Sequence, residues 1–263
     1  MDSVINKEYE KEEKQLRIQY ERWANNIIET CPEFFEDEKY SNPYYISIPD
    51  GWFEESIRIM IVGLEGYGEN GRKTADDGTK INYNDFEKIQ AWNYNYLRSQ
   101  LGKANIYKKN YSNFWRRFRA ISEFGVCCWS NIDKIHVRGS GAGKCKLSKT
   151  EREKLHQMDI SILNEEIKIL KPTHVVYFGF YGISLKNECP EVFCILYPKG
   201  LDDNSRWYKS IVPIQHKGIC HIFAYHPAWV GKRKPKGYED EVIDTVRRCI
   251  FELPAFNEES CLI

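Results

Sequence analysis

Three side chains with complementary chemistry each follow a short apolar run of the sequence: Glu65, Asn131 and His226. A carboxylate can stabilise positive charge and position a water molecule, and an imidazole can donate to a developing anion. An amide both donates and accepts hydrogen bonds. Each residue alone has a structural explanation, as a turn acid, a cap or an interior histidine, so their joint placement is the informative feature.

The positions of these side chains depend on four apolar runs. The runs are residues 57–62, 126–129, 174–178 and 219–225, and residues 192–197 form a fifth candidate. Unalternating apolar runs separated by helical segments indicate strands that are buried on both faces of a parallel sheet. We therefore predict an α/β fold, a three-layer α/β/α sandwich with a central, mainly parallel four-stranded sheet. Open parallel sheets bind ligands at their carboxyl edge, so the three side chains should meet there.

Helical patterns lie before and between these runs. Residues 4–30 predict a charged amphipathic helix with one apolar face, formed by Leu16, Tyr20, Trp23 and Ile27. We assign residues 1–56 to this helix and an extension packed on the core, and residues 57–263 to one α/β/α domain. A further helix is predicted at residues 152–170.

Two more helices are predicted around the strands. Residues 113–124 should bury Phe114, Phe118 and Ile121 and leave Arg116, Arg117 and Arg119 largely outward. The segment 236–253 should close the fold as a helix with four inward residues, Val242, Val246, Cys249 and Ile250.

The glycine cluster after the first run permits a second interpretation. Gly66, Gly68 and Gly71 fit the G-x-G-x-x-G pattern of dinucleotide-binding turns. The residues that follow are polar and show no helical apolar period, so the helix that would hold a pyrophosphate is missing. A second glycine loop, residues 136–146, lacks the spacing of a phosphate-binding P-loop. The sequence therefore favours a catalytic turn after residue 62.

Charge is unevenly distributed along the 263 residues, although the net charge is zero. Residues 1–60 contain 7 Lys and Arg against 14 Asp and Glu, and residues 61–263 contain 31 against 24. Four cations of the basic part are concentrated in one short segment and could hold phosphates: Lys232, Arg233, Lys234 and Lys236. The N-terminal residues show no apolar core of signal-peptide length, and no apolar run reaches membrane-spanning length, so we expect a soluble, cytoplasmic protein. Nine cysteines without C-x-x-C spacing predict reduced thiols and no metal centre.

Two of these segments resemble motifs of the uracil-DNA glycosylase superfamily. "GLEGYG" at 63–68 resembles the family's GQDPYP, and "HPAWVG" at 226–231 resembles HPSPLS. Gly63 matches the first glycine, Glu65 stands at the catalytic aspartate, and Tyr67 matches the tyrosine that walls the pyrimidine pocket. "GVCCWSNIDKI" resembles the segment GVLLLN, with one extra residue, and this makes Asn131 the candidate reader of the base.

This resemblance implies a uracil-DNA-glycosylase-like fold and a monofunctional DNA glycosylase that removes uracil or a modified pyrimidine from DNA. The implied catalytic residues are Glu65 and His226, and the implied base-binding residues are Gly63, Gly66, Tyr67 and Asn131. The expected DNA-contacting residues are Trp229, Val230, Lys232, Arg233, Lys234 and Lys236, where Trp229 or Val230 would fill the gap left by a flipped base. We expect a monomer that needs no cofactor or metal and has no membrane partner, active in base excision or in defence against modified phage DNA.

Departures from the family motifs leave the substrate open. Glutamate replaces aspartate, and Gly66 and Gly68 replace the two prolines that keep the turn rigid. A freer turn could move the Tyr67 ring aside and admit a bulkier pyrimidine than uracil. The alternative function is a non-catalytic member of the fold that binds nucleic acid or a partner protein through the same edge.

Overall fold

The computed structural model describes residues 9–37, 39–63, 82–137, 148–178, 212–216, 218–224 and 238–252. The chain divides into two compact units. Unit 1 comprises Met1–Asp50, Glu65–Arg98 and Ser130–Leu170, and unit 2 comprises Gly51–Leu64, Ser99–Trp129 and Lys171–Ile263. The predicted domain boundary after residue 56 stays a prediction.

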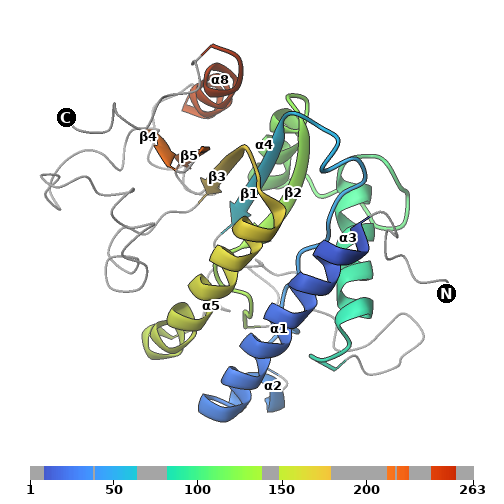
Figure 1. Ribbon diagram of the computed structural model, residues 1–263, viewed down its shortest axis with the longest axis vertical. Helices are drawn as coiled ribbons and strands as arrows, with labels where there is room; N and C mark the ends of the chain where they lie inside the picture. Colours follow the sequence, from blue (N-terminus) through green and yellow to red (C-terminus); the bar gives the residue numbers. More distant parts are fainter. Residues whose placement is uncertain are drawn as a thin grey trace, which may run out of the picture. The chain divides into compact units, whose positions relative to one another are not determined.

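A five-stranded sheet with the order β2-β1-β3-β5-β4 forms the centre of the fold (Figure 1). The strands are β1 (Arg58–Gly63), β2 (Val126–Asn131), β3 (His174–Phe178), β4 (Val212–His216) and β5 (Ile219–Ala224). The strands β2, β1, β3 and β5 are parallel, and β4 is antiparallel to β5. The predicted mainly parallel sheet of four strands is confirmed, and β4 is an addition to it. The strand β4 contains Pro213, and proline is tolerated at a sheet edge because it cannot donate to the ladder.

The sheet is buried on both of its faces. Residues Ile59, Met60, Ile61 and Val62 of β1 are all 0% exposed. On one face lie α4 (Asn113–Ile121) and α8 (Tyr238–Phe251), which pack against each other, and α8 also packs against β5. Side chains of the opposite face are buried as well, including Tyr177, whose hydroxyl lies 3.1 Å from Nδ1 of His221. The fold is the predicted three-layer α/β/α class.

The parallel strands begin together at the amino edge of the sheet. Val126 N–H donates to the carbonyl of Ile57 at 3.1 Å, and Thr173 N–H donates to the carbonyl of Arg58 at 2.9 Å. Gly125 permits the first contact, because a Cβ at this position would lie 2.6 Å from the Ile57 carbonyl oxygen. The carboxyl ends of the strands therefore emerge at one common, opposite edge.

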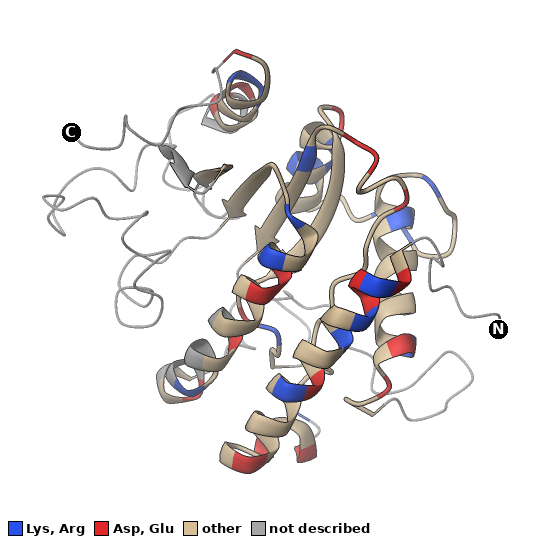
Figure 2. Ribbon diagram, viewed as in Figure 1, with Lys and Arg blue, Asp and Glu red and all other residues tan. Residues whose placement is uncertain are grey.

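Unit 1 contains most of the helical residues of the described chain. Its helices are α1 (Glu10–Thr30), α2 (Glu33–Glu36), α3 (Phe86–Gln100) up to residue 98, and α5 (Lys149–Leu170). Acidic and basic residues are interspersed along α1 (Figure 2), while its predicted apolar face of Leu16, Tyr20, Trp23 and Ile27 is at most 4% exposed. The inward orientation of this face is confirmed, and α1 packs against α5.

The long helix α5 begins at a reciprocal pair of hydrogen bonds. Glu151 N–H donates to Oγ of Ser148 at 3.2 Å, and Ser148 N–H donates to Oε2 of Glu151 at 2.6 Å. This is a capping box, which satisfies two backbone donors at the start of the helix. It explains why the helix begins three residues before the predicted position at residue 152.

Three predicted orientations differ in the structure. Arg117 of α4, predicted to point outward, is 3% exposed, on a short helix that also buries Trp115. Phe114, predicted to point inward, is half-buried. In α8, Val242, Val246 and Cys249 are buried as predicted, and Ile250 is half-buried.

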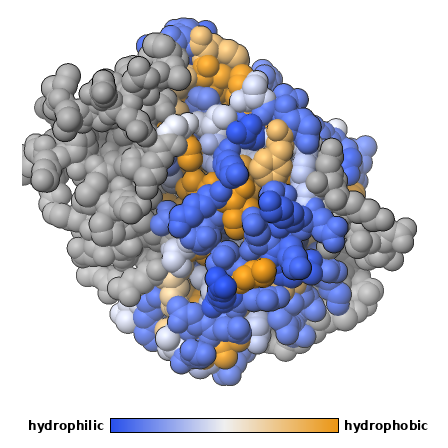
Figure 3. Space-filling view, viewed as in Figure 1, coloured by the Kyte–Doolittle hydropathy of each residue, from blue (hydrophilic) through white to orange (hydrophobic). Residues whose placement is uncertain are grey.

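The described surface in Figure 3 is mainly hydrophilic, with small hydrophobic patches between polar residues. Among the described helices, none is long and apolar enough to span a membrane.

Candidate functional site

The carboxyl edge of the sheet is where the predicted site begins. The strands β2, β1, β3 and β5 end at Asn131, Gly63, Phe178 and Ala224. Neighbouring strands lie about 4.8 Å apart, so the four ends span about 15 Å. The chain therefore leaves β1 after Gly63 and β5 after Ala224 at the same edge.

Two of the twelve predicted site residues belong to the described part of the chain. Gly63 is the last residue of β1 and is buried, and Asn131 is the last residue of β2 and is 2% exposed. The other predicted residues lie outside the described residues: Glu65, Gly66, Tyr67, His226, Trp229, Val230, Lys232, Arg233, Lys234 and Lys236.

Asn131 lies within a buried segment that is unusually polar. Its neighbours Ser130, Asp133 and Lys134 are at most 1% exposed. A buried polar side chain is tolerated only where hydrogen bonds or ion pairs compensate for the lost water. The bonds made by Ser130 and Lys134 are therefore central to the stability of this segment.

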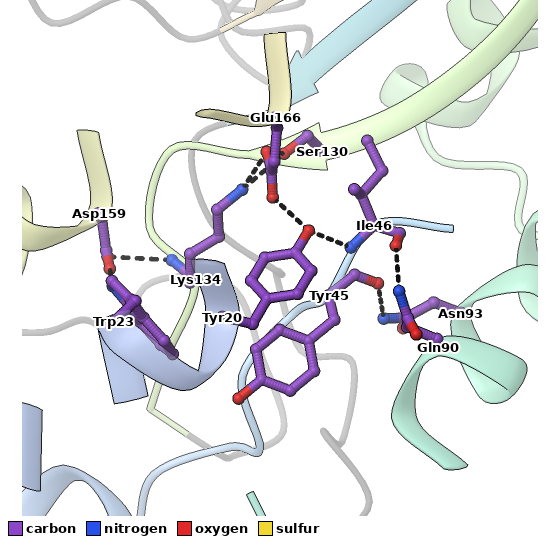
Figure 4. Close-up of polar contacts among 10 residues, drawn as sticks. All are labelled: Tyr20, Trp23, Tyr45, Ile46, Gln90, Asn93, Ser130, Lys134, Asp159 and Glu166. Atoms are coloured by element: carbon purple, nitrogen blue, oxygen red, sulfur yellow. Dashed lines mark hydrogen bonds and ion pairs between the residues drawn. The ribbon is translucent and has the colours of Figure 1, made fainter. Parts of the chain in front are cut away.

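A single carboxylate, Glu166 of α5, accepts three hydrogen bonds in this region (Figure 4). Its Oε2 accepts from Lys134 Nζ at 2.7 Å and from Ser130 Oγ at 2.7 Å. Lys134 Nζ also donates to Ser130 Oγ at 2.6 Å. The Lys134 and Glu166 side chains are 1% and 0% exposed, so this ion pair is fully desolvated.

The other oxygen of Glu166 connects the cluster to α1. Tyr20 donates its hydroxyl hydrogen to Glu166 Oε1 at 2.7 Å and accepts from the N–H of Ile46 at 2.8 Å. Burial raises the pKa of Tyr20 well above its ordinary value, and the negative charge of Glu166 raises it further. The phenol is therefore a neutral donor at all physiological pH values.

A second buried carboxylate of α5 binds the backbone of the same segment. Asp159 Oδ2 accepts from the N–H of Lys134 at 3.0 Å, and Oδ1 accepts from Trp23 Nε1 at 2.9 Å. Burial raises the pKa of Asp159 to about 7, and the hydrogen bond from Lys134 opposes part of this rise. Asp159 and Glu166 are seven residues apart, which places them on one face of α5, two turns from each other.

The arrangement holds the chain on both sides of Asn131. Ser130 and Lys134 flank it, and both are bonded to side chains of α5. We call the five residues Tyr20, Ser130, Lys134, Asp159 and Glu166 the buried polar cluster. The carboxylate and the ammonium group of its ion pair are engaged in hydrogen bonds within the cluster, and these bonds hold the segment in place.

Sequence reasoning missed the buried polar cluster. A usable signal was the pair of acids, Asp159 and Glu166, on the face of α5 that also contains buried Leu155, Ile162 and Leu163. Acids on an apolar helix face are rare unless they are paired.

Two buried amide side chains, Gln90 and Asn93, bind the backbone of the segment before β1. Asn93 of α3 donates to the Tyr45 carbonyl at 2.7 Å, and Gln90 donates to the Ile46 carbonyl at 3.1 Å (Figure 4). Gln90 also donates to Glu13 at 2.9 Å. Burial raises the pKa of Glu13, and hydrogen bonds from Ile48 and Gln90 partly oppose this effect.

No protein-family model matches the chain, and no curated protein matches it. Within the described ranges, no group of three or more His, Cys, Asp or Glu residues could hold a metal ion. The resemblance to the uracil-DNA glycosylase superfamily thus depends on the motif residues and on the strands that precede them.

Proposed function

We propose that the protein is a DNA glycosylase that hydrolyses the N-glycosidic bond of uracil or a modified pyrimidine. The supporting observation is the strand order. Asn131 ends β2, and Glu65 and His226 each follow by two residues the end of a strand of the same parallel group, β1 and β5. A carboxylate, an amide and an imidazole therefore follow three strand ends at one edge of the sheet.

The proposed reaction breaks the bond between C1′ of the sugar and the base nitrogen. Positive charge develops on the sugar, and the base leaves with the bonding electrons. The Glu65 carboxylate stabilises the sugar cation and orients the water molecule whose oxygen bonds to C1′. The attacking water releases one proton to solvent as its oxygen bonds to C1′. His226 donates a hydrogen bond to the oxygen of the departing base, and the base takes up one proton from solvent, so that protons balance.

Selectivity for the base is assigned to Asn131. Its amide has an NH₂ group that donates hydrogen bonds and a carbonyl oxygen that accepts them, and these match the hydrogen-bonding edge of a pyrimidine. A recognition side chain discriminates well only when its backbone is held rigidly, because a displaced group forms weaker bonds to the correct base. The bonds of Ser130 and Lys134 to α5 supply this rigidity.

The test is abasic-site formation on labelled oligonucleotides. Single-stranded and duplex DNA containing one uracil, thymine, 5-hydroxymethylcytosine or glucosylated 5-hydroxymethylcytosine is incubated with protein and then cleaved with alkali. Glu65→Gln and His226→Ala should each lower turnover at least about 100-fold and leave DNA affinity nearly unchanged, because both groups act on transition-state charge. Glu241→Gln, an exposed acid of α8, is the matched control.

The same assay examines the pocket and the alternative function. If the native protein releases only uracil and Tyr67→Ala gains thymine, the tyrosine blocks C5 substituents and the enlarged pocket is wrong. If no substrate yields abasic sites although DNA is bound, the protein is a non-catalytic binder and the glycosylase proposal fails.

A further inference from the structure

The charged residues of one long segment, which runs from α3 through α4, are all positive. From Lys88 to Ser122 the sequence has eight Lys and Arg and no Asp or Glu. In unit 2, this segment forms the loop 101–112 and α4, whose ribbons show blue and no red in Figure 2. Four of its cations are exposed: Lys103, Lys108, Lys109 and Arg116.

The same loop exposes an aromatic ring and an aliphatic side chain. Tyr111 is 72% exposed and Ile106 is 56% exposed, and they are two of four large hydrophobic residues exposed among the described residues. The Arg119 guanidinium lies 5.7 Å from the centroid of the Tyr111 ring. An exposed ring beside cations is the combination that stacks a nucleic-acid base while phosphates are neutralised.

The charges of the loop are available to a ligand. Within the described part of the chain, Lys103, Lys108 and Lys109 form no ion pair. Exposed lysines elsewhere do form them, such as Lys154 with Glu33 at 3.2 Å. A polyanion would meet no competing carboxylate from the loop itself.

Hydrogen bonds hold the loop in one shape. Tyr107 N–H donates to Ser99 Oγ at 3.1 Å, and Asn110 N–H donates to Gln100 Oε1 at 2.6 Å. Gln100 Nε2 in turn donates to the carbonyl of Lys108 at 3.0 Å. Binding to a loop that is already ordered loses less conformational entropy.

The loop leads into α4 near the carboxyl edge of the sheet. The ring centroid of Phe114, in the first turn of α4, lies 5.9 Å from the ring centroid of Phe178, the last residue of β3. The Phe114 ring centroid also lies 6.2 Å from the ring centroid of Trp129, in the carboxyl half of β2. Tyr111 is three residues before Phe114, so the exposed ring belongs to the same end of unit 2.

We propose that the surface formed by Lys103, Ile106, Lys108, Lys109, Tyr111, Arg116 and Arg119 binds single-stranded DNA. The cations contact successive phosphates, and Tyr111 stacks on an unpaired base. A duplex would offer the phosphates but no free base face, so the ring selects the single strand. The choice of DNA over RNA rests on the proposed glycosylase function. The assignment of this surface to single-stranded nucleic acid does not depend on that function.

Binding is measured by fluorescence anisotropy with a labelled 20-nucleotide thymidine strand, the matching duplex and a uridine RNA strand, over a range of salt concentrations. The variant Lys103→Ser/Lys108→Ser/Lys109→Ser should lower the slope of log affinity against log salt by about 2, at about 0.7 per phosphate contact. Tyr111→Ala should weaken single-strand binding about 5- to 150-fold, and Tyr111→Phe should retain it. The control removes three exposed cations elsewhere, Lys11, Lys14 and Lys154.

Several results would overturn the assignment. They are an unchanged salt slope in the triple variant, an equal change in the control, an equal effect of Tyr111→Ala on duplex and single strand, and a preference for the RNA strand. All variants are compared by thermal unfolding to confirm that they are folded. The anisotropy assay measures DNA binding and does not require base release, so it can also be carried out with Glu65→Gln. Loss of the proposed binding surface and loss of the proposed glycosylase activity are therefore distinguishable.

Discussion

Replacing Glu166 by Gln would remove the carboxylate that pairs with the Lys134 ammonium group in the buried polar cluster. The ammonium group is 1% exposed and lies 2.7 Å from Glu166 Oε2. In the variant, the single glutamine oxygen can accept two hydrogen bonds, but three donors compete for it: Lys134, Ser130 and Tyr20. The native state would then contain a desolvated cation without a counter-charge.

The expected loss of stability is about 3–5 kcal/mol, the usual effect of removing one partner from a buried ion pair. The neighbouring residue provides a matched control. Glu165 pairs with Lys168 at 2.6 Å, but these side chains are 33% and 69% exposed. Glu165→Gln should therefore cost less than about 1 kcal/mol, and that small loss should shrink in high salt.

Equilibrium unfolding in urea, followed by tryptophan fluorescence, measures both variants. The double variant Lys134→Met/Glu166→Gln removes the unpaired cation and should recover part of the loss. Equal midpoints for Glu165→Gln and Glu166→Gln, at equal slopes, would show that the Lys134 pair is not desolvated in solution and would refute the reasoning.

Three further predictions concern single residues. Burial holds the pKa of Asp159 at about 7, above its ordinary 3.8; its contribution to stability is complete below about pH 4, falls as the pH rises from 4 to 7, and levels off above 7. Urea unfolding should therefore show a loss of about 2.5 kcal/mol between pH 5 and 8 that Asp159→Asn lacks. Gly125→Ala should cost about 1–3 kcal/mol in thermal unfolding, because its methyl group would lie 2.6 Å from the Ile57 carbonyl oxygen; an unchanged melting temperature would contradict this close approach. Lys171, just after α5, has a φ of 48°, so Lys171→Gly should gain up to about 1 kcal/mol in urea unfolding and Lys171→Ala should gain little.

The strands of the parallel group were predictable because their sequences are locally explicit. Unbroken apolar runs rich in Val and Ile indicate buried strands, and β3 lies within the predicted bounds. The strand β4 was not predictable, since Pro213 and the polar residues Gln215 and His216 give it no such pattern. Only its pairing with β5 makes it a strand.

Helix α3 was missed for a different reason. Its buried residues include Gln90 and Asn93, so its inner face lacks a clean apolar period. These amides are buried because backbone carbonyls at Tyr45 and Ile46, more than forty residues earlier, accept their hydrogens. Such contacts over long sequence separation leave no local signal.

The buried polar cluster shows the same limit at the candidate site. Asn131 was identified from its position after a predicted strand. Lys134, three residues later, is of a residue type that is usually exposed in loops. Its burial depends on Glu166, 32 residues further along the chain. The predicted strand ended at residue 129, whereas Asn131 is the last residue of β2. The sequence pattern thus located Asn131 near the strand end, and the groups that hold it are defined by tertiary packing.

The division of roles between Asn131 and Glu65 leads to a kinetic prediction that depends on the proposed function. A carboxylate that stabilises the sugar cation acts on every substrate, so Glu65→Gln should lower kcat for uracil and for other bases alike. A positioning cluster acts through the base-reading amide, so the folded double variant Lys134→Met/Glu166→Gln should mainly lower the ratio of kcat/KM between the preferred base and its competitors. The two effects are separable in one competition assay with matched oligonucleotides. If the double variant loses turnover and keeps its base preference, the cluster stabilises the fold without orienting Asn131, because a misplaced reader could not preserve discrimination.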